Sequence, residues 1–210
     1  GSIPIGSTIF KSTEVVMPDI VDPLIPVVIS IIALAVSGFT AWATFRRGTV
    51  KMTRPTFIAF LYDHPCSKPE EAKIFIRSLL YSTGKRGHII ENMFVSVRRG
   101  DEKQSFNIWG HTINEKMFRG SGLFVDETGV VENHHFTSLA MLPRHFFIPY
   151  EYELKIFVAI VGKKKPLQVS KVNLVVPENA REDLLKPNSA VWFDWEPNLE
   201  RYHARVEIKS

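Results

Sequence analysis

The feature that most constrains this chain is an uninterrupted apolar stretch near its beginning, from Leu24 to Phe45, which contains no charged residue. In a helix built from this stretch, apolar side chains would lie on every side rather than along one stripe. At a rise of ~1.5 Å per residue, such a helix is long enough to cross a hydrocarbon core of ~30 Å. The sequence therefore predicts a single transmembrane helix over residues 24–45.

Two other interpretations of the stretch stay open. A buried core helix is the first, although this run is long for a helix of that kind. A cleaved signal peptide is the second, because Ala41 and Ala43 match the small-x-small pattern of a cleavage site. Against it, the preceding segment has a single basic residue, Lys11, and the apolar run exceeds the usual ~7–15 residues. A permanent anchor accounts best for the length and the flanks.

The charges that flank the stretch predict its orientation. Four basic residues follow it before residue 55 without an acid among them, whereas Glu14, Asp19 and Asp22 precede it. Because Lys and Arg concentrate on cytoplasmic flanks, we expect the C-terminal part of the chain to face the cytoplasm. The candidates for contact with anionic lipid headgroups are the same four basic residues, Arg46, Arg47, Lys51 and Arg54.

Small residues recur at four-residue spacing within the stretch, at Ala33, Ser37 and Ala41. Small side chains at this spacing allow two transmembrane helices to approach closely. The pattern is therefore a candidate contact for a homo-oligomer.

The remainder of the chain has the size and composition of one folded domain. About 160 residues follow the stretch, which is an ordinary domain length. The whole chain is 45% hydrophobic and 23% charged, enough to bury a core. Its net charge of +4 comes from basic residues spread along the sequence, which disfavours a nucleic-acid-binding protein. We expect a leader over 1–23, the helix over 24–45, a basic juxtamembrane linker over 46–55 and a β domain over 56–210.

Short apolar runs of period two, separated by glycine, proline and polar turns, predict strands throughout the β domain. Residues 144–161 form the strongest predicted strand, and residues 114–122 predict a connection. Glu127-Thr-Gly129 predicts a hairpin turn with glycine at positive φ. Residues 177–187 predict the one short helix, with a proline at each end. The period-two pattern is typical of an all-β sandwich or barrel. Eight or nine antiparallel strands joined by short turns favour two packed sheets, an antiparallel β-sandwich.

One strand carries a tyrosine pattern. The run Tyr150-Glu-Tyr152-Glu-Leu154 resembles the tyrosine-bearing strand of immunoglobulin-like sandwiches, in which the ring hydroxyl bonds back across a corner. The Cys…Trp…Cys frame of immunoglobulin domains is missing, because the chain has a single cysteine. The expected fold is therefore all-β and immunoglobulin-like in architecture only, with one short helix after the transmembrane helix.

Two longer segments carry a resemblance to a known family. Together with the apolar stretch, KIFIRSLLYSTGKRGHIIENMFVSVRRG and SGLFVDETGVVENHHF resemble bacterial single-span proteins that join an N-terminal anchor to a cytoplasmic-side β domain. The resemblance covers most of residues 24–176 and leaves out the closing FDWEPNLERY hairpin. It implies a bacterial inner-membrane location, and it implies no activity and transfers no catalytic residue.

Histidine and cysteine supply the candidates for chemistry. His134 and His135 are the densest pair, but neighbours on a strand point to opposite faces and cannot readily share one metal ion. His64 lies near Cys66, and a thiol close to a base is the minimum that a nucleophilic site requires. The sequence contains no HxH, HExxH or GxSxG spacing. We therefore assign no catalytic residue, cofactor or metal ligand.

Near the C-terminus, Trp192, Asp194 and Trp195 form a candidate interaction surface. The two tryptophans should lie on opposite faces of a strand, so at least one is a candidate for an exposed anchor of a protein partner. Another interpretation places one ring in the core and the other over a sheet edge.

Two functional hypotheses follow. The leading hypothesis is a membrane-anchored, non-enzymatic module that presents a protein-interaction surface at the inner membrane face. The alternative is a membrane-tethered hydrolase, or a redox or metal sensor, that uses Cys66 and His64 or the His134–His135 region. A third interpretation, a domain displayed outside the cell, depends on the topology alone.

Overall fold

In a computed structural model of the protein, the structure describes residues 24–45, 48–63, 71–113, 116–120, 122–138, 146–184, 186 and 189–208. Its contacts divide the chain into two units, which meet in the sequence between Ala43 and Thr44. The expected leader over 1–23 lies outside the described residues.

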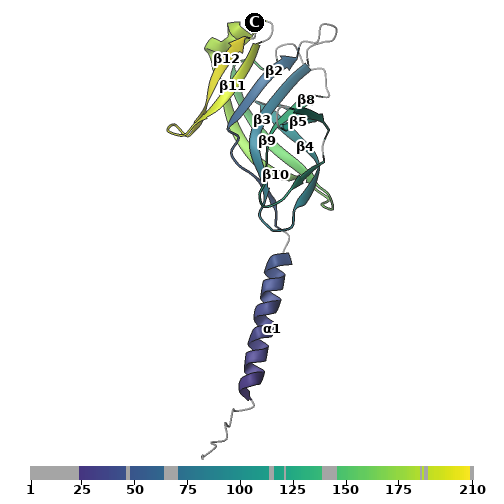
Figure 1. Ribbon diagram of the computed structural model, residues 1–210. Helices are drawn as coiled ribbons and strands as arrows, with labels where there is room; N and C mark the ends of the chain where they lie inside the picture. The colour runs from purple at the N-terminus through teal and green to yellow at the C-terminus, as the bar shows by residue number, and fades with distance from the viewer. Residues whose placement is uncertain are drawn as a thin grey trace, which may run out of the picture. The chain divides into compact units, whose positions relative to one another are not determined.

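The apolar stretch is one helix, α1, over Leu24–Phe45 (Figure 1). It is long and apolar enough to cross a membrane, and its described side chains are exposed. The hydroxyls of Ser30 and Thr40 donate hydrogen bonds of 2.7 Å to the carbonyls of Pro26 and Val36. Because these hydroxyls are satisfied within the helix, they suit an environment without water.

The second unit is built from antiparallel strands that belong to one sheet. Along the sheet the order is β10-β9-β4-β5-β8-β3-β2-β11-β12, and in addition β1 pairs with β3, β6 with β5 and β7 with β4. The twelve strands of the described chain are β1 Val50–Met52, β2 Phe57–Asp63, β3 Glu71–Ser82, β4 His88–Arg99, β5 Glu102–Ile113, β6 Lys116–Arg119, β7 Leu123–Val125, β8 Val130–Ser138, β9 Tyr150–Ile160, β10 Leu167–Val176, β11 Ser189–Glu196 and β12 Arg201–Ile208.

The sheet curves until it is nearly barrel-shaped (Figure 1). Strand β10, at one end of the order, contacts both β12 at the other end and β1. The predicted two-sheet sandwich of immunoglobulin type is therefore not confirmed. A strongly curved sheet encloses its own inner face, so a second sheet is not needed to cover the core.

The alternating apolar positions of the strands meet in a single core on the inner face. Phe60 illustrates the packing: its ring stacks on Phe147 with centroids 4.3 Å apart and meets Tyr152 and Phe193 edge-on at 5.4 and 5.0 Å. All four side chains are at most 2% exposed. The period-two pattern of the sequence thus corresponds to burial in the structure.

A tyrosine corner closes the chain segment before β9. The hydroxyl of Tyr152 donates to the carbonyl of Ile148 at 2.7 Å and accepts from the Ile148 amide at 2.9 Å. The neighbouring amide of Phe147 donates to the Tyr62 hydroxyl at 2.8 Å, and Arg99 donates to the Phe146 carbonyl at 2.6 Å. A tyrosine corner of the kind that this strand resembles is thus present, although the immunoglobulin-like architecture is not confirmed.

Two short strands lie where the sequence predicted no strand. Strand β1 falls inside the expected linker, and β6 falls inside the expected connection over 114–122. Both have only three or four residues, too few to show a period-two pattern. Their pairing with longer strands, not their own composition, makes them part of the sheet.

For the turn before β8, the predicted backbone conformation is confirmed and the predicted hairpin pairing is wrong. Gly129 has φ +77, and the Asp126 carboxylate accepts hydrogen bonds from the amides of Thr128 and Gly129. The flanking strands do not pair with each other, however, because β7 pairs with β4 and β8 pairs with β3 and β5. The predicted hairpin is therefore a turn between strands with different partners.

The predicted short helix between β10 and β11 is confirmed as two consecutive helical turns. A 3-10 turn, η1, over Glu178–Ala180 continues into α2 over Arg181–Leu184. Its buried side chains, Ala180 and Leu184, join the core.

Candidate functional site

A group of polar side chains lies on the inner face of the sheet, among apolar neighbours. Glu132 and His134 share the inner face of β8 with Phe136, because residues two apart on a strand point the same way. Ser78 on β3 is the register partner of Glu132. Glu132 is 3% exposed, Ser78 is 2% exposed and His134 is fully buried.

A bulge in β5 brings a second histidine to this group. Regular pairing continues to Ile108, which opposes Phe136, and after the bulge His111 opposes His134. Without the extra residue, Gly110 would take the inner position and His111 would face outward. We call the resulting set the interior polar cluster, namely Ser78, His111, Glu132 and His134.

The interior polar cluster holds polar atoms without a hydrogen-bond partner in the described chain. Both ring nitrogens of His134, Nδ1 of His111, Oε2 of Glu132 and Oγ of Ser78 are in this state. The shortest charged contact joins His111 Nε2 to Glu132 Oε2 at 4.0 Å, which is too long for a hydrogen bond. An unpaired buried polar group costs about 1–3 kcal/mol, so the cluster lowers the stability of the domain.

Burial suppresses charge in this cluster. Desolvation, with smaller contributions from the neighbouring His111 and His135, lowers the pKa of His134 to about 3. Desolvation also raises the pKa of Glu132, and His111 opposes that shift. At neutral pH the ring of His134 is therefore uncharged, and no described group donates a hydrogen bond to its unprotonated nitrogen.

His135 belongs to the opposite face, as the sequence predicted. Its Nε2 lies 3.0 Å from the hydroxyl of Thr112, and its ring contacts Phe75 with centroids 4.1 Å apart. Burial, Lys73 and His111 lower its pKa to about 4. His134 and His135 thus do not form one site. Within the described ranges, no three His, Cys, Asp or Glu side chains come together as ligands for a metal ion.

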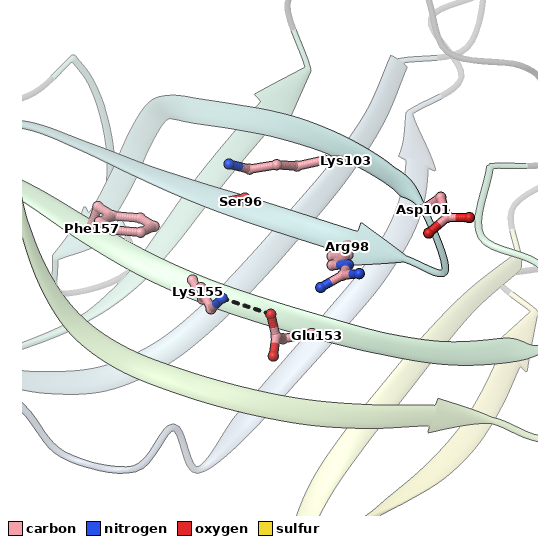
Figure 2. Close-up of a pocket in the computed structure, with 7 residues that line it drawn as sticks. All are labelled: Ser96, Arg98, Asp101, Lys103, Glu153, Lys155 and Phe157. Carbon is pink, nitrogen blue, oxygen red and sulfur yellow. Dashed lines mark ion pairs between the residues drawn. The ribbon is translucent and has the colours of Figure 1, made fainter.

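A charged depression lies on the outer face of β4, β5 and β9 (Figure 2). It has a volume of about 280 Å³. We call it the outer depression; its lining residues are Ser96, Arg98, Asp101, Lys103, Glu153, Lys155 and Phe157.

Register explains why these side chains gather. Arg98 opposes Lys103 on one side and Glu153 on the other. In the next row Ser96 opposes Lys155, which opposes Lys171 on β10. Directly opposed residues of an antiparallel pair have Cβ atoms ~5 Å apart, so the rows form one continuous surface.

One carboxylate in this surface is strongly paired. Glu153 places one oxygen 2.8 Å from Lys155 Nζ and the other 2.6 Å from Lys171 Nζ. Hydrogen bonds to these two ammonium groups lower the pKa of Glu153 to about 2. Arg98 instead donates through Nε to the carbonyl of Gly100 at 2.9 Å. The Glu153 carboxylate therefore stays charged at neutral pH.

The predicted interaction surface on β11 is involved in contacts within the domain. The Trp195 ring lies 3.8 Å below the guanidinium of Arg54 and packs against Tyr202. Trp192, on the other face of the strand, is half-buried against Phe57 with ring centroids 5.5 Å apart. Asp194 is exposed, 3.8 Å from Arg205. Whether this surface binds a partner stays a prediction.

The remaining candidates differ in whether the structure describes them. Arg46, Arg47, His64 and Cys66 lie outside the described residues. Lys51 is exposed on β1, and Arg54 is held by the Trp195 contact described above. The helix positions with small side chains are exposed on α1; they are Ala33, Ser37 and Ala41.

Sequence reasoning missed both polar groups of the sheet. The interior polar cluster depends on a bulge, which leaves no mark in the hydrophobic pattern of β5. The outer depression depends on the register of β4, β5, β9 and β10, which are not all neighbours in sequence. A signal was present: alternation alone places Arg98 and Lys155 on outward positions of their strands.

No protein-family model matches the chain, and no curated protein matches its sequence. The resemblance to bacterial single-span proteins therefore stays a prediction.

Proposed function

We propose that the protein is a single-pass membrane protein whose β domain acts as a non-enzymatic binding module on the cytoplasmic face of a bacterial inner membrane. The observation that carries the proposal is α1, an exposed apolar helix of 22 residues, in a chain whose second unit is a β domain. An exposed apolar surface of that extent needs a lipid or protein cover.

The orientation in this proposal rests on the flanking charges. Arg46, Arg47, Lys51 and Arg54 follow the helix, and basic flanks are retained on the cytoplasmic side. The binding role rests on the β domain's surface, where the charged outer depression and the Trp192 region are available to a ligand or a partner.

Membrane attachment is tested first, with the full chain expressed in bacteria. The chain should remain in the membrane fraction after alkaline carbonate washing. The double variant Ile31→Arg/Leu34→Arg should be released, since central charges oppose insertion, and the matched variant Ile31→Leu/Leu34→Ile should stay. Release of the unaltered chain would contradict the anchor.

The single cysteine tests the topology. A membrane-impermeant thiol reagent should label Cys66 only after the cells are permeabilised, with a denatured sample as the control for a buried thiol. Labelling in intact cells would place the β domain outside and replace the cytoplasmic proposal. Affinity capture from solubilised membranes then tests the module, and recovery of no specific partner or ligand would count against it.

A second function, a membrane-tethered hydrolase or a redox or metal sensor, is favoured by the interior polar cluster. Its neutral His134 and unpaired Glu132 oxygen are groups that proteins use for proton transfer or metal binding. Stoichiometric metal in the purified full chain, lost in His134→Leu, would favour this function. A low-pKa thiol, seen as rapid alkylation of Cys66 at acidic pH, would favour it through Cys66 and His64.

A further inference from the structure

Two like-charged pairs of directly opposed residues lie in and beside the outer depression, and Lys171 is the one member that does not line it. Arg98 faces Lys103 across β4 and β5, and Lys155 faces Lys171 across β9 and β10. Like charges directly opposite each other on one face of a sheet are destabilising. Such an arrangement calls for an anion between the two members of each pair.

Glu153 directly opposes Arg98 on β9, yet its ion pairs are with the other like-charged pair. Glu153 bridges Lys155 and Lys171 with its two oxygens. Within the described chain, neither Arg98 nor Lys103 has an ion-pair partner. Asp101, in the turn beside them, lines the same depression without pairing to either residue (Figure 2).

The surroundings of Arg98 and Lys103 suit a small anion. Arg98 offers a planar guanidinium, and Lys103 offers a mobile ammonium group; phosphate binds both through charge-assisted hydrogen bonds. Ser96 is 5% exposed and adds a hydroxyl between the strands. A volume of about 280 Å³ is at the lower limit for ligand pockets, enough for a phosphate with a small attached group.

We propose that the outer depression binds a phosphate group between Arg98 and Lys103, as Glu153 binds between Lys155 and Lys171. Phe157, whose ring stacks on Phe94 with centroids 4.9 Å apart, provides an apolar wall for the group attached to the phosphate. The phosphate belongs either to a soluble phosphorylated compound or to a lipid headgroup. The inference rests on the proposed function, because it names the ligand class of the binding module.

Lysine protection tests the proposal on the full chain in a non-ionic detergent that contains no phosphate. Lysines are acetylated with a limiting reagent and read by mass spectrometry, in inorganic phosphate and in chloride of equal ionic strength. Phosphate should slow the acetylation of Lys103 and Lys155 severalfold. Lys163 and Lys164, in the exposed turn after β9, are the internal controls and should be unaffected.

Variants test which residues hold the anion. Arg98→Gln should raise the phosphate concentration that half-protects Lys103 about tenfold, because the variant loses a charge-assisted hydrogen bond. Arg201→Gln removes the same charge from an exposed position of β12 and should change nothing. Asp101→Asn should tighten binding, because it removes a carboxylate from the depression. Thermal unfolding of each variant confirms that the fold is retained.

Nanodiscs distinguish the two sources, with phosphatidylcholine alone as the comparison. Phosphatidic acid replaces part of the phosphatidylcholine, and no free phosphate is added. Protection of Lys103 and Lys155 there assigns the site to a lipid headgroup; protection by free phosphate alone assigns it to a soluble compound. No protection in either arm, or equal protection of Lys163 and Lys164, overturns the proposal.

The failure of this inference is separable from that of the proposed function. If the chain resists carbonate washing and Lys103 is unprotected, the anchor stands and the phosphate site is wrong. If the chain is released and Lys103 is protected, the site stands and the anchor is wrong.

Discussion

The interior polar cluster and the outer depression lie on opposite faces of the same curved sheet, and they treat ionisable groups in opposite ways. Inside, burial lowers the pKa of His134 to about 3 and leaves its ring neutral without a partner. Outside, two ammonium groups lower the pKa of Glu153 to about 2 and keep it charged. Burial and charged neighbours, more than the residue type, decide whether a polar side chain carries charge: His135, on the outward face, is also neutral at pH 7 because it is buried.

The difference has a functional meaning. The proposed anion site lies in the outer depression, where the effect of charges should depend on salt because solvent screens them. The interior polar cluster instead responds to acid, because its groups gain or lose protons at the expense of folding. Four changes test this contrast, two on each face.

The largest loss of stability is expected from Gly110→Val, which places a side chain in the β5 bulge that brings His111 into the interior polar cluster. A Cβ at Gly110 would lie 2.5 Å from the carbonyl oxygen of Phe118, in the backbone of β6. The bulge must therefore shift, at a cost of about 3 kcal/mol in the free energy of unfolding. Chemical denaturation measures it, with Ser105→Val at an exposed position of the same strand as the control. Equal losses in both variants would show that the bulge accommodates a side chain.

His134→Leu should stabilise the domain by about 2 kcal/mol at neutral pH, since it removes two unpaired buried nitrogens. In the parent chain, His134 and His135 stay neutral to pH values of about 3 and 4, whereas unfolded histidine binds protons below 6.5. The free energy of unfolding should therefore fall as the pH drops from 6.5 toward 4. His134→Leu should make this fall shallower, and His203→Gln, at an exposed position, should not. A steeper fall in His134→Leu would contradict the interpretation.

Lys103→Thr should raise the free energy of unfolding by about 0.5 kcal/mol at low salt, by relieving the repulsion with Arg98. The gain should vanish at high salt, since exposed charges are screened, whereas the effect of His134→Leu should persist. Lys163→Thr in the exposed turn is the control. If the stability changes caused by Lys103→Thr and His134→Leu depended equally on salt, the contrast between the two faces would be wrong.

Glu153→Gln is expected to have the smallest effect, because exposed ion pairs contribute little. It should lower stability at neutral pH by leaving Lys155 and Lys171 unbridged. In the parent chain, the Glu153 carboxylate contributes fully to stability above pH 4.5, the pKa of an unfolded glutamate, and this contribution is lost as the pH falls through about 2. The free energies of unfolding of the parent and the variant should therefore converge in strong acid. Glu151→Gln, exposed on the same face of β9, is the control. A difference that grows in acid would be incompatible with a lowered pKa.

Local pattern predicted much of the fold. The apolar helix over 24–45, most of the longer strands, the positive φ of Gly129 and the helical turns after Pro177 all follow from neighbouring residues. Such features need no knowledge of which strands pair. The tyrosine pattern of residues 150–154 pointed to a corner contact, but the partners of Tyr152 are visible only in the structure.

The architecture did not follow in the same way. Alternating strands fit a sandwich and a curved single sheet equally well, because both bury one face of each strand. The choice was made by pairings between distant segments, such as β3 with β8 and β2 with β11. The turn at Gly129 shows the same limit: its conformation is local and its strand partners are not.

By itself, therefore, the sequence determined an uncharged helix, the strands that alternate in polarity and the opposite faces of His134 and His135. Only the tertiary structure decided that His111 joins His134 inside and that Arg98 meets Lys103 outside. The first depends on one extra residue in β5, and the second on strand register. A shift of one residue in pairing reverses the face of every side chain that follows, and no local preference sets that shift.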